Sequence, residues 1–307
     1  MKRVRNATLL VIVALAVLLV PSGCKTESRT EATSVETARI ELMQKVPVFY
    51  EDFDFWNVNS LREDPDLAEL YQIWFDRKMK FLEERYGIDS SGIKYFAEGE
   101  GLLDIIVAQY DIEALRANIA AEFQRDTRYP DIEVWKSLPP ADFISSNPPS
   151  VTGGWVLAEG LLVRGANNSN VDDYLSVVQG QELSQYDRNA AEVLERLPEG
   201  LLVRIGRSAV PSPLGVVVNG MSVSKEEKTT LKWTNVYKFE NDEASGKALA
   251  NEYFKKIEDD FKKAQDELTK RGEPAPFSSF TIKQDGEFVE WSMLIEAKYM
   301  IALLFYG

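Results

Sequence analysis

Residues 93–110 read IKYFAEGEGLLDIIVAQY, and this stretch decides the fold class of the chain. Its apolar residues alternate on both sides of Gly99-Glu100-Gly101, which is typical of a tight turn, so two antiparallel strands are predicted over 93–97 and 102–110. Apolar residues at helical spacing flank this hairpin on either side. We therefore expect an α+β protein with helices packed on one face of antiparallel sheet.

The first half of the chain, 46–137, predicts the order βαββαβ, the split arrangement of ferredoxin-like domains. A strand is expected over 48–56, and a helix begins at Asp64-Pro65, because aspartate caps free amides and proline fits the first turn. Gly87 ends that helix. Asp111 caps a second helix whose inward face carries Ile112, Leu115, Ile119 and Phe123, and residues 132–135 make the last strand.

A proline-rich stretch over 138–150 is the expected linker to the second half, 151–307. There the patterns predict a hairpin over 155–164, helices over 171–178 and 189–197, and strands over 214–223 and 230–239. A long helix capped by Asn241 or Asp242 should run to Gly272, followed by a closing hairpin over 277–295.

The sequence Glu-Gly-Leu-Leu occurs at 100–103, 159–162 and 199–202, and the last two copies extend identically through Val-Arg. In each copy the glycine is expected to supply a turn from which an apolar strand departs. Convergence on a favourable hairpin is one explanation. Duplication of a unit is the other, and it predicts that the two halves are related.

The N-terminal segment, residues 1–23, begins with basic residues and continues with an apolar run over 7–20. This is the layout of a secretory signal peptide, and the run is shorter than the roughly 18 to 20 residues that span a bilayer. Pro21-Ser22-Gly23 then leads directly to Cys24, the only cysteine. Small residues followed by cysteine resemble the lipobox of bacterial lipoprotein precursors, although Pro21 stands where that family has leucine.

The resemblance implies that Cys24 is acylated and becomes the new N-terminus, with ordinary secretion and an uncleaved anchor as alternatives. Lys25 after it implies passage to an outer membrane, if the cell has one. Removing residues 1–23 leaves 32 basic and 49 acidic residues, a net charge of −17. Such a surface is repelled by nucleic acid and by anionic lipid, so the lipid on Cys24 would have to hold the protein at the membrane. The polar stretch that follows predicts a flexible tether over 24–45.

The available residue types restrict the chemistry. The chain has no histidine, so no imidazole can act as a general base, complete a Ser-His-Asp triad or bind zinc. Ser-x-x-Lys occurs three times, one or two of which are expected from composition alone, and the partner motifs of serine-lysine enzymes are missing. These pairs are Ser22/Lys25, Ser91/Lys94 and Ser222/Lys225.

Carboxylates are the remaining acid–base groups. Asp52 and Asp54 share a strand face, while Glu98, Glu100 and Asp104 surround the 93–110 turn. Two carboxylates about 5 or 9 Å apart could cleave a glycosidic bond. Tryptophans could stack on the sugar, although at strand and helix spacing they usually belong to the core. The six are Trp56, Trp74, Trp135, Trp155, Trp233 and Trp291.

Oxygen ligands crowd the stretch 167–173 and would suit calcium, but they lack the spacing and glycine of an EF-hand loop. A helix start rich in Asn and Asp is the other interpretation. The residues are Asn167, Asn168, Asn170, Asp172 and Asp173. Because a helix start accounts for 167–173, no metal is expected. No glycine loop that would hold a phosphate is present, so no cofactor is expected either.

These observations predict a lipid-anchored, extracytoplasmic protein that acts by binding a protein or glycan at the cell envelope, with no catalytic residues. The alternative is a carboxylate-dependent hydrolase of envelope polysaccharide. Sheet faces that helices leave uncovered, and the apolar end over 303–306, are the first places where a partner is expected.

Overall fold

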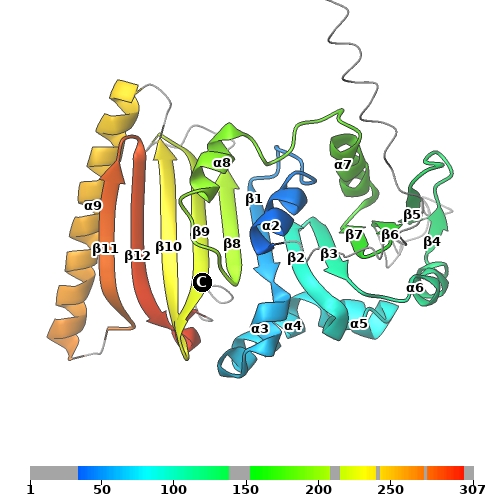
Figure 1. The fold of residues 1–307 in the computed structure, drawn as a ribbon, viewed down its shortest axis with the longest axis horizontal. Helices are drawn as coiled ribbons and strands as arrows, with labels where there is room; N and C mark the ends of the chain where they lie inside the picture. The colour runs from blue at the N-terminus through cyan, green and yellow to red at the C-terminus, as the bar shows by residue number, and fades with distance from the viewer. Residues whose placement is uncertain (1–33, 138–152, 208–214, 240–242, 273–274, 301–307) are drawn as a thin grey trace, which may run out of the picture. The chain divides into compact units, whose positions relative to one another are not determined.

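Every strand pair in the computed structural model is antiparallel, and the strands join into one sheet of twelve (Figure 1). The structure describes residues 34–137, 153–207, 215–239, 243–272 and 275–300. The strand order is β11-β12-β10-β9-β8-β1-β2-β3-β7-β6-β5-β4. The strands are β1 (Asp52–Asn57), β2 (Ile93–Gly99), β3 (Leu103–Ala108), β4 (Phe123–Arg125), β5 (Glu133–Ser137), β6 (Gly154–Ala158), β7 (Leu161–Gly165), β8 (Leu202–Arg207), β9 (Val216–Glu227), β10 (Thr230–Phe239), β11 (Phe277–Asp285) and β12 (Phe288–Glu296).

Helices cover both faces of this sheet, so the prediction that they pack on one face is wrong. Successive strand residues point to opposite sides, and both sides are apolar. The helices are α2 (Val35–Met43), α3 (Val58–Glu63), α4 (Ala68–Lys78), α5 (Lys80–Tyr86), α6 (Ile112–Ile119), α7 (Asn168–Val178), α8 (Arg188–Leu194) and α9 (Glu243–Arg271), with short 3-10 turns η1 (Pro65–Leu67) and η2 (Ser90–Gly92).

The two faces have separate cores. On one, which we call the α4 face, Trp56, Phe96 and Ile106 pack with α3 to α6. On the other, the α8 face, Phe55 and Ile105 pack with α2, α7 and α8. The helix α9 lies against β10, β11 and β12 on the α4 face, since Val289 belongs to its cluster while the preceding Phe288 belongs to the core of the α8 face.

The local predictions for the first half are largely confirmed. The hairpin over 93–110 is β2 and β3, and Gly101 adopts a φ of 69° in its turn. The Asp64 side chain accepts a hydrogen bond from the amide of Asp66, and Gly87 ends the helical region with a φ of 71°. That region is broken at Met79 into α4 and α5, and Phe123 lies in the short strand β4 instead of in the second helix.

The prediction of a flexible tether over 24–45 is wrong for residues 35–43, which form α2. Ala38, Leu42 and Met43 are buried in the core of the α8 face, so three apolar side chains at helical spacing order a segment of polar composition. Residues 24–33, which include Cys24, lie outside the described residues. So do the linker 138–150 with the neighbouring 151–152, and residues 303–306.

The second half also follows its local patterns. The long helix is α9, 29 residues from Glu243 to Arg271, and Gly272 after it has a φ of 68°. The closing hairpin is β11 and β12, and Gly286 in its turn has a φ of 62°. The two strands before α9 are β9 and β10, as predicted.

The mixed α+β class is therefore shown, whereas the ferredoxin-like detail and the division into two related halves are not confirmed. In a ferredoxin-like unit the first strand would pair with the third, but here β1 pairs with β2, which lies between β1 and β3. Strands of the two expected halves also interleave, since β8 pairs with β1 and β7 pairs with β3. The described residues from Val35 onward belong to one compact unit.

Candidate functional site

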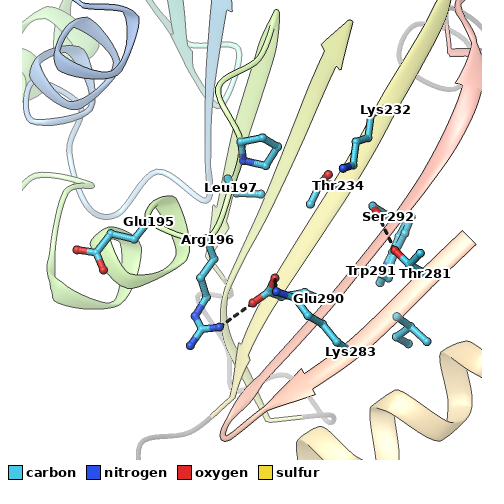
Figure 2. A pocket seen from close by; sticks show the side chains of 12 residues that line it. Glu195, Arg196, Leu197, Lys232, Thr234, Thr281, Lys283, Glu290, Trp291 and Ser292 are labelled. Carbon is cyan, nitrogen blue, oxygen red and sulfur yellow. Dashed lines mark hydrogen bonds and ion pairs between the residues drawn. The ribbon is translucent and has the colours of Figure 1, made fainter. Parts of the chain in front are cut away.

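A pocket of about 500 Å³ lies on the α8 face of the C-terminal strands, where α8 ends (Figure 2). The helix α8 packs on β9 and β10 at one side of the pocket. The helix α9 covers the opposite face of β10, β11 and β12. The pocket is lined by Glu195, Arg196, Leu197, Pro198, Lys232, Thr234, Thr281, Ile282, Lys283, Glu290, Trp291 and Ser292. It is a place where a helix leaves part of the sheet face open.

Hydroxyl groups form a row across this face. Ser222 of β9, Thr234 of β10, Ser292 of β12 and Thr281 of β11 stand opposite one another in the strand register, so their side chains share one face. We call these four residues the hydroxyl row. Ser222 donates to the Pro198 carbonyl at 2.8 Å, and the Thr281 and Ser292 hydroxyls are 2.9 Å apart.

Thr234 differs from the other three members. It is 8% exposed, and its Oγ1 atom has no hydrogen-bond partner within the described residues. A buried hydroxyl without a partner costs free energy of roughly 1 to 3 kcal/mol, so such groups call for an explanation. Thr234 also lines the pocket, so this hydroxyl belongs to the candidate site.

The charges around the row favour an anionic ligand. Glu290 is buried, with its two oxygens 2.7 Å from Arg196 and 2.6 Å from Lys283. Lys232 lies on the same face, two residues before Thr234, and its side chain makes no ion pair or hydrogen bond with the described part of the chain. Three basic residues and two acidic residues, Glu195 and Glu290, therefore line a pocket in a protein of net charge −14.

The wall made by the end of α8 is fixed by a second set of contacts. Lys238 is 2% exposed; it bonds to Glu192 and lies 2.8 Å from the Asn189 amide oxygen. The hydrogen bond from Lys238, and then that from Arg188, lower the pKa of Glu192. Arg196 lies 4.0 Å from the centre of the Phe288 ring. These contacts hold α8 against β10 and β12 and fix this wall of the pocket.

The carboxylates singled out in the sequence come together elsewhere, on the α4 face. The register places Asp54, Glu98 and Asp104 side by side on β1, β2 and β3, with an arginine beyond each end. This charged row reads Arg204, Asp54, Glu98, Asp104, Arg164. Lys78 of α4 bonds to the central member, Glu98.

Each carboxylate of the charged row is held by a base. Arg204 binds both oxygens of Asp54, at 2.6 and 2.7 Å, and Arg164 lies 2.8 Å from Asp104. Burial raises the pKa of Glu98 against the attraction of Lys78, and the neighbouring Asp104 and Asp54 raise it further. Burial also raises the pKa of Asp104. Three acids facing three bases make a neutral network, which is typical of a structural role.

The other predicted candidates have local structural roles. Asn167 and Asn170 form a reciprocal capping box at the start of α7, and Asp173 accepts a hydrogen bond from Tyr50. Lys225 bonds to Asp64 and Asp66, not to Ser222. In the described ranges no group of three or more His, Cys, Asp or Glu is placed to hold a metal ion.

Glu100 lies in the β2–β3 turn with a φ of 52°, and burial raises the pKa of Asp52. Ser91 donates its hydroxyl to Asp89. The tryptophans lie in or against packed regions: Trp56, Trp74 and Trp155 are buried, and Trp135, Trp233 and Trp291 are partly buried.

The hydroxyl row was missed in the sequence. Its members are spread over four strands between residues 222 and 292, and only the strand register brings them together. A period of two that places Lys232 and Thr234 on one face of a strand was the available signal.

Among the helices of the described residues, none is long and apolar enough to cross a membrane. No protein-family model, no curated protein and no solved structure matches this chain.

Proposed function

We propose that this chain is a lipid-anchored, extracytoplasmic binding protein that holds an acidic glycan on the hydroxyl row, and that it acts by binding and not by catalysis. The anchor rests on the sequence around Cys24. The binding role rests on one observation above all: within the described residues the buried hydroxyl of Thr234 has no partner, and Thr234 lines the pocket together with Lys232, whose side chain has none there either.

The chemistry of the pocket selects the ligand class. Hydroxyl groups donate and accept hydrogen bonds, so the three members of the row that line the pocket, Thr234, Thr281 and Ser292, match the hydroxyl groups of a sugar. An ammonium group without a protein partner favours a carboxylate, in a charge-assisted hydrogen bond about twice as strong as a neutral one. A saccharide that carries a carboxylate, such as a uronic acid, satisfies both requirements.

The test compares tetragalacturonate, which is acidic, with maltotetraose, which is neutral and of similar size, by titration calorimetry on the purified chain 24–307. We expect Lys232→Gln to weaken tetragalacturonate binding about tenfold, the equivalent of about 1.4 kcal/mol. Thr234→Val should weaken it about three- to tenfold while leaving the free energy of unfolding no lower, because the hydroxyl has no partner among the residues that the structure describes.

The control is Lys94→Gln, which removes an exposed lysine from β2. Equal affinities for the two oligosaccharides, or equal affinities of Lys232→Gln and Lys94→Gln, would contradict the proposal. The hydrolase alternative would be favoured if new reducing ends were released from tetragalacturonate and if this activity were lost in Glu98→Gln. The raised pKa values of Glu98 and Asp104 are the observation that supports this alternative.

We also propose that the two halves are related only through β7 and β8. These strands carry the identical hexapeptide copies, each of which presents its second leucine and its arginine to the α4 face and its valine to the α8 face. Leu103 of the first copy points to the α8 face, out of phase with Leu162 and Leu202. Gly200 also differs, since it precedes β8 without a hairpin turn.

A further inference from the structure

We propose that a second pocket binds a small carboxylate that carries an apolar ring. This pocket, of about 220 Å³, lies on the α4 face between α5 and the strands β4, β6 and β7, away from the hydroxyl row, and its role is independent of the function proposed above. It is lined by Phe81, Arg85, Tyr86, Phe123, Gly153, Gly154, Trp155, Arg164, Gly165 and Ala166. We call it the arginine pocket.

One part of its lining is aromatic. Tyr86 and Trp155 are buried with ring centres 5.0 Å apart, and Phe123 stands edge-on to Trp155 at 6.3 Å. Phe81 completes this group at 6.0 Å from Tyr86, yet it is 51% exposed. A large aromatic side chain that stays in water beside a hollow lined by other rings provides apolar surface that a ligand ring can cover.

The other part is cationic. Arg85 and Arg164 are the only charged residues in the described lining, which gives this pocket two positive charges in an acidic protein. Each guanidinium is held from behind by one carboxylate: Arg85 lies 2.6 Å from Glu122, and Arg164 lies 2.8 Å from Asp104.

These ion pairs leave donors for a ligand. A guanidinium has five N–H donors, and each of the two contacts engages a single nitrogen. Both arginine side chains are about one-third exposed, at 32% each. A planar carboxylate matches the fork of a guanidinium with two parallel hydrogen bonds, so these partly fixed arginines suit a carboxylate better than a spherical anion.

The volume limits the size of the ligand. Pockets for drug-sized molecules start at about 300 Å³, so the arginine pocket accepts a smaller compound. Gly154 and Gly165 border it on β6 and β7. A single ring with a carboxylate, the size of phenylacetate, fits these conditions.

The test uses the chain 24–307 with three probes: phenylacetate, its neutral isostere phenylacetamide, and inorganic phosphate. Binding is followed by titration calorimetry and by the indole N–H signals of ¹⁵N-labelled tryptophan, with the Trp155 signal assigned from Trp155→Phe. We expect saturable binding of phenylacetate that shifts the Trp155 signal, with phenylacetamide at least tenfold weaker.

Two variants locate the site. Arg85→Gln should weaken phenylacetate binding about tenfold, and Phe81→Ala should weaken it a few-fold; Phe81 is half exposed, so this change leaves the fold intact. Arg164 is left in place, since its removal would strand the buried Asp104. Lys94→Gln is the matched control and should bind as the parent does.

The proposal is overturned if phenylacetate and phenylacetamide bind equally, if Arg85→Gln binds phenylacetate as well as Lys94→Gln does, or if the Trp155 signal does not respond. Binding of inorganic phosphate in preference to phenylacetate would also overturn it, since that would identify an anion site without an apolar part. Tetragalacturonate binding is measured in the same variants and should be unchanged, which separates this result from the test of the hydroxyl row.

Discussion

Replacing Lys78 by methionine tests whether the charged row is a balanced ion network. Lys78 is the last residue of α4 and bonds to Glu98, which lies between Asp54 and Asp104 on the neighbouring strands. Methionine keeps most of the side-chain volume and has a helix propensity similar to that of lysine. The substitution therefore leaves Glu98 buried between two carboxylates without its cation.

The size of the effect follows from burial. Removing one partner of a fully buried ion pair costs about 3 to 5 kcal/mol. The side chains of Lys78 and Glu98 are 27% and 12% exposed, so water reaches the pair in part. We expect Lys78→Met to lower the free energy of unfolding by about 2 kcal/mol at pH 7.5, below the range for full burial.

The loss should depend on pH with a definite sign. Burial already holds the pKa of Glu98 above its ordinary value, and removing Lys78 takes away the attraction that opposes this shift. Folded Glu98 then binds a proton at pH values where the unfolded chain has released it, so the free energy of unfolding falls as pH rises from about 4.3 to the raised pKa. The deficit of Lys78→Met should shrink well below its value at pH 7.5 when measured at pH 4.5.

Urea unfolding of parent and variant at pH 4.5 and 7.5, followed by circular dichroism, measures both quantities. Lys80→Met is the matched control, because Lys80 is 52% exposed and pairs with an exposed Asp76 at 3.7 Å; it should cost less than about 0.5 kcal/mol. Adding Glu98→Gln to Lys78→Met should restore most of the stability. A deficit equal to that of Lys80→Met, or one that is the same at both pH values, would refute the reasoning.

Two further predictions concern the packing and the turns. Trp74→Ala should lower the free energy of unfolding by about 3 to 5 kcal/mol, because Trp74 is fully buried against Trp56 and Phe96. The control Phe49→Ala removes a half-exposed aromatic side chain and should cost far less. Urea unfolding of both variants measures the difference. Gly160→Ala should lower the free energy of unfolding by about 1 kcal/mol in the same measurement, because a Cβ there meets open space and only the φ of 73° is strained. A loss above about 3 kcal/mol would contradict this account.

Local features of the fold could be predicted from the sequence because they depend on neighbouring residues. The turn at Gly101, the caps at Asp64 and Asp111 and the length of α9 were all predicted from spacing and capping residues. The order of strands in the sheet could not be predicted this way. The pairing of β1 with β8 joins residues about 150 positions apart, and neither strand carries a signal that names its partner.

The sites show the same division. Asp54, Glu98 and Asp104 were recognised as carboxylates close in the sequence or on one strand, but the two arginines and the lysine that neutralise them come from β8, β7 and α4. The sequence therefore indicated acids that could react, and the fold pairs them with bases. An uncovered sheet face was expected to hold a partner surface. That stays a prediction, and the strand register shows only that four hydroxyl residues stand side by side on such a face.

The position of β1 between β2 and β8 affects how the chain folds during synthesis. During synthesis β1 can pair with β2 early, but its other edge stays open until residues 202–207 have been made. That edge belongs to a strand in which five of the six residues end up buried, and open strand edges of this kind recruit other chains. A polypeptide truncated before residue 202 would leave this edge of β1 permanently unpaired and exposed. The first two-thirds of the protein therefore depend on the last third for solubility.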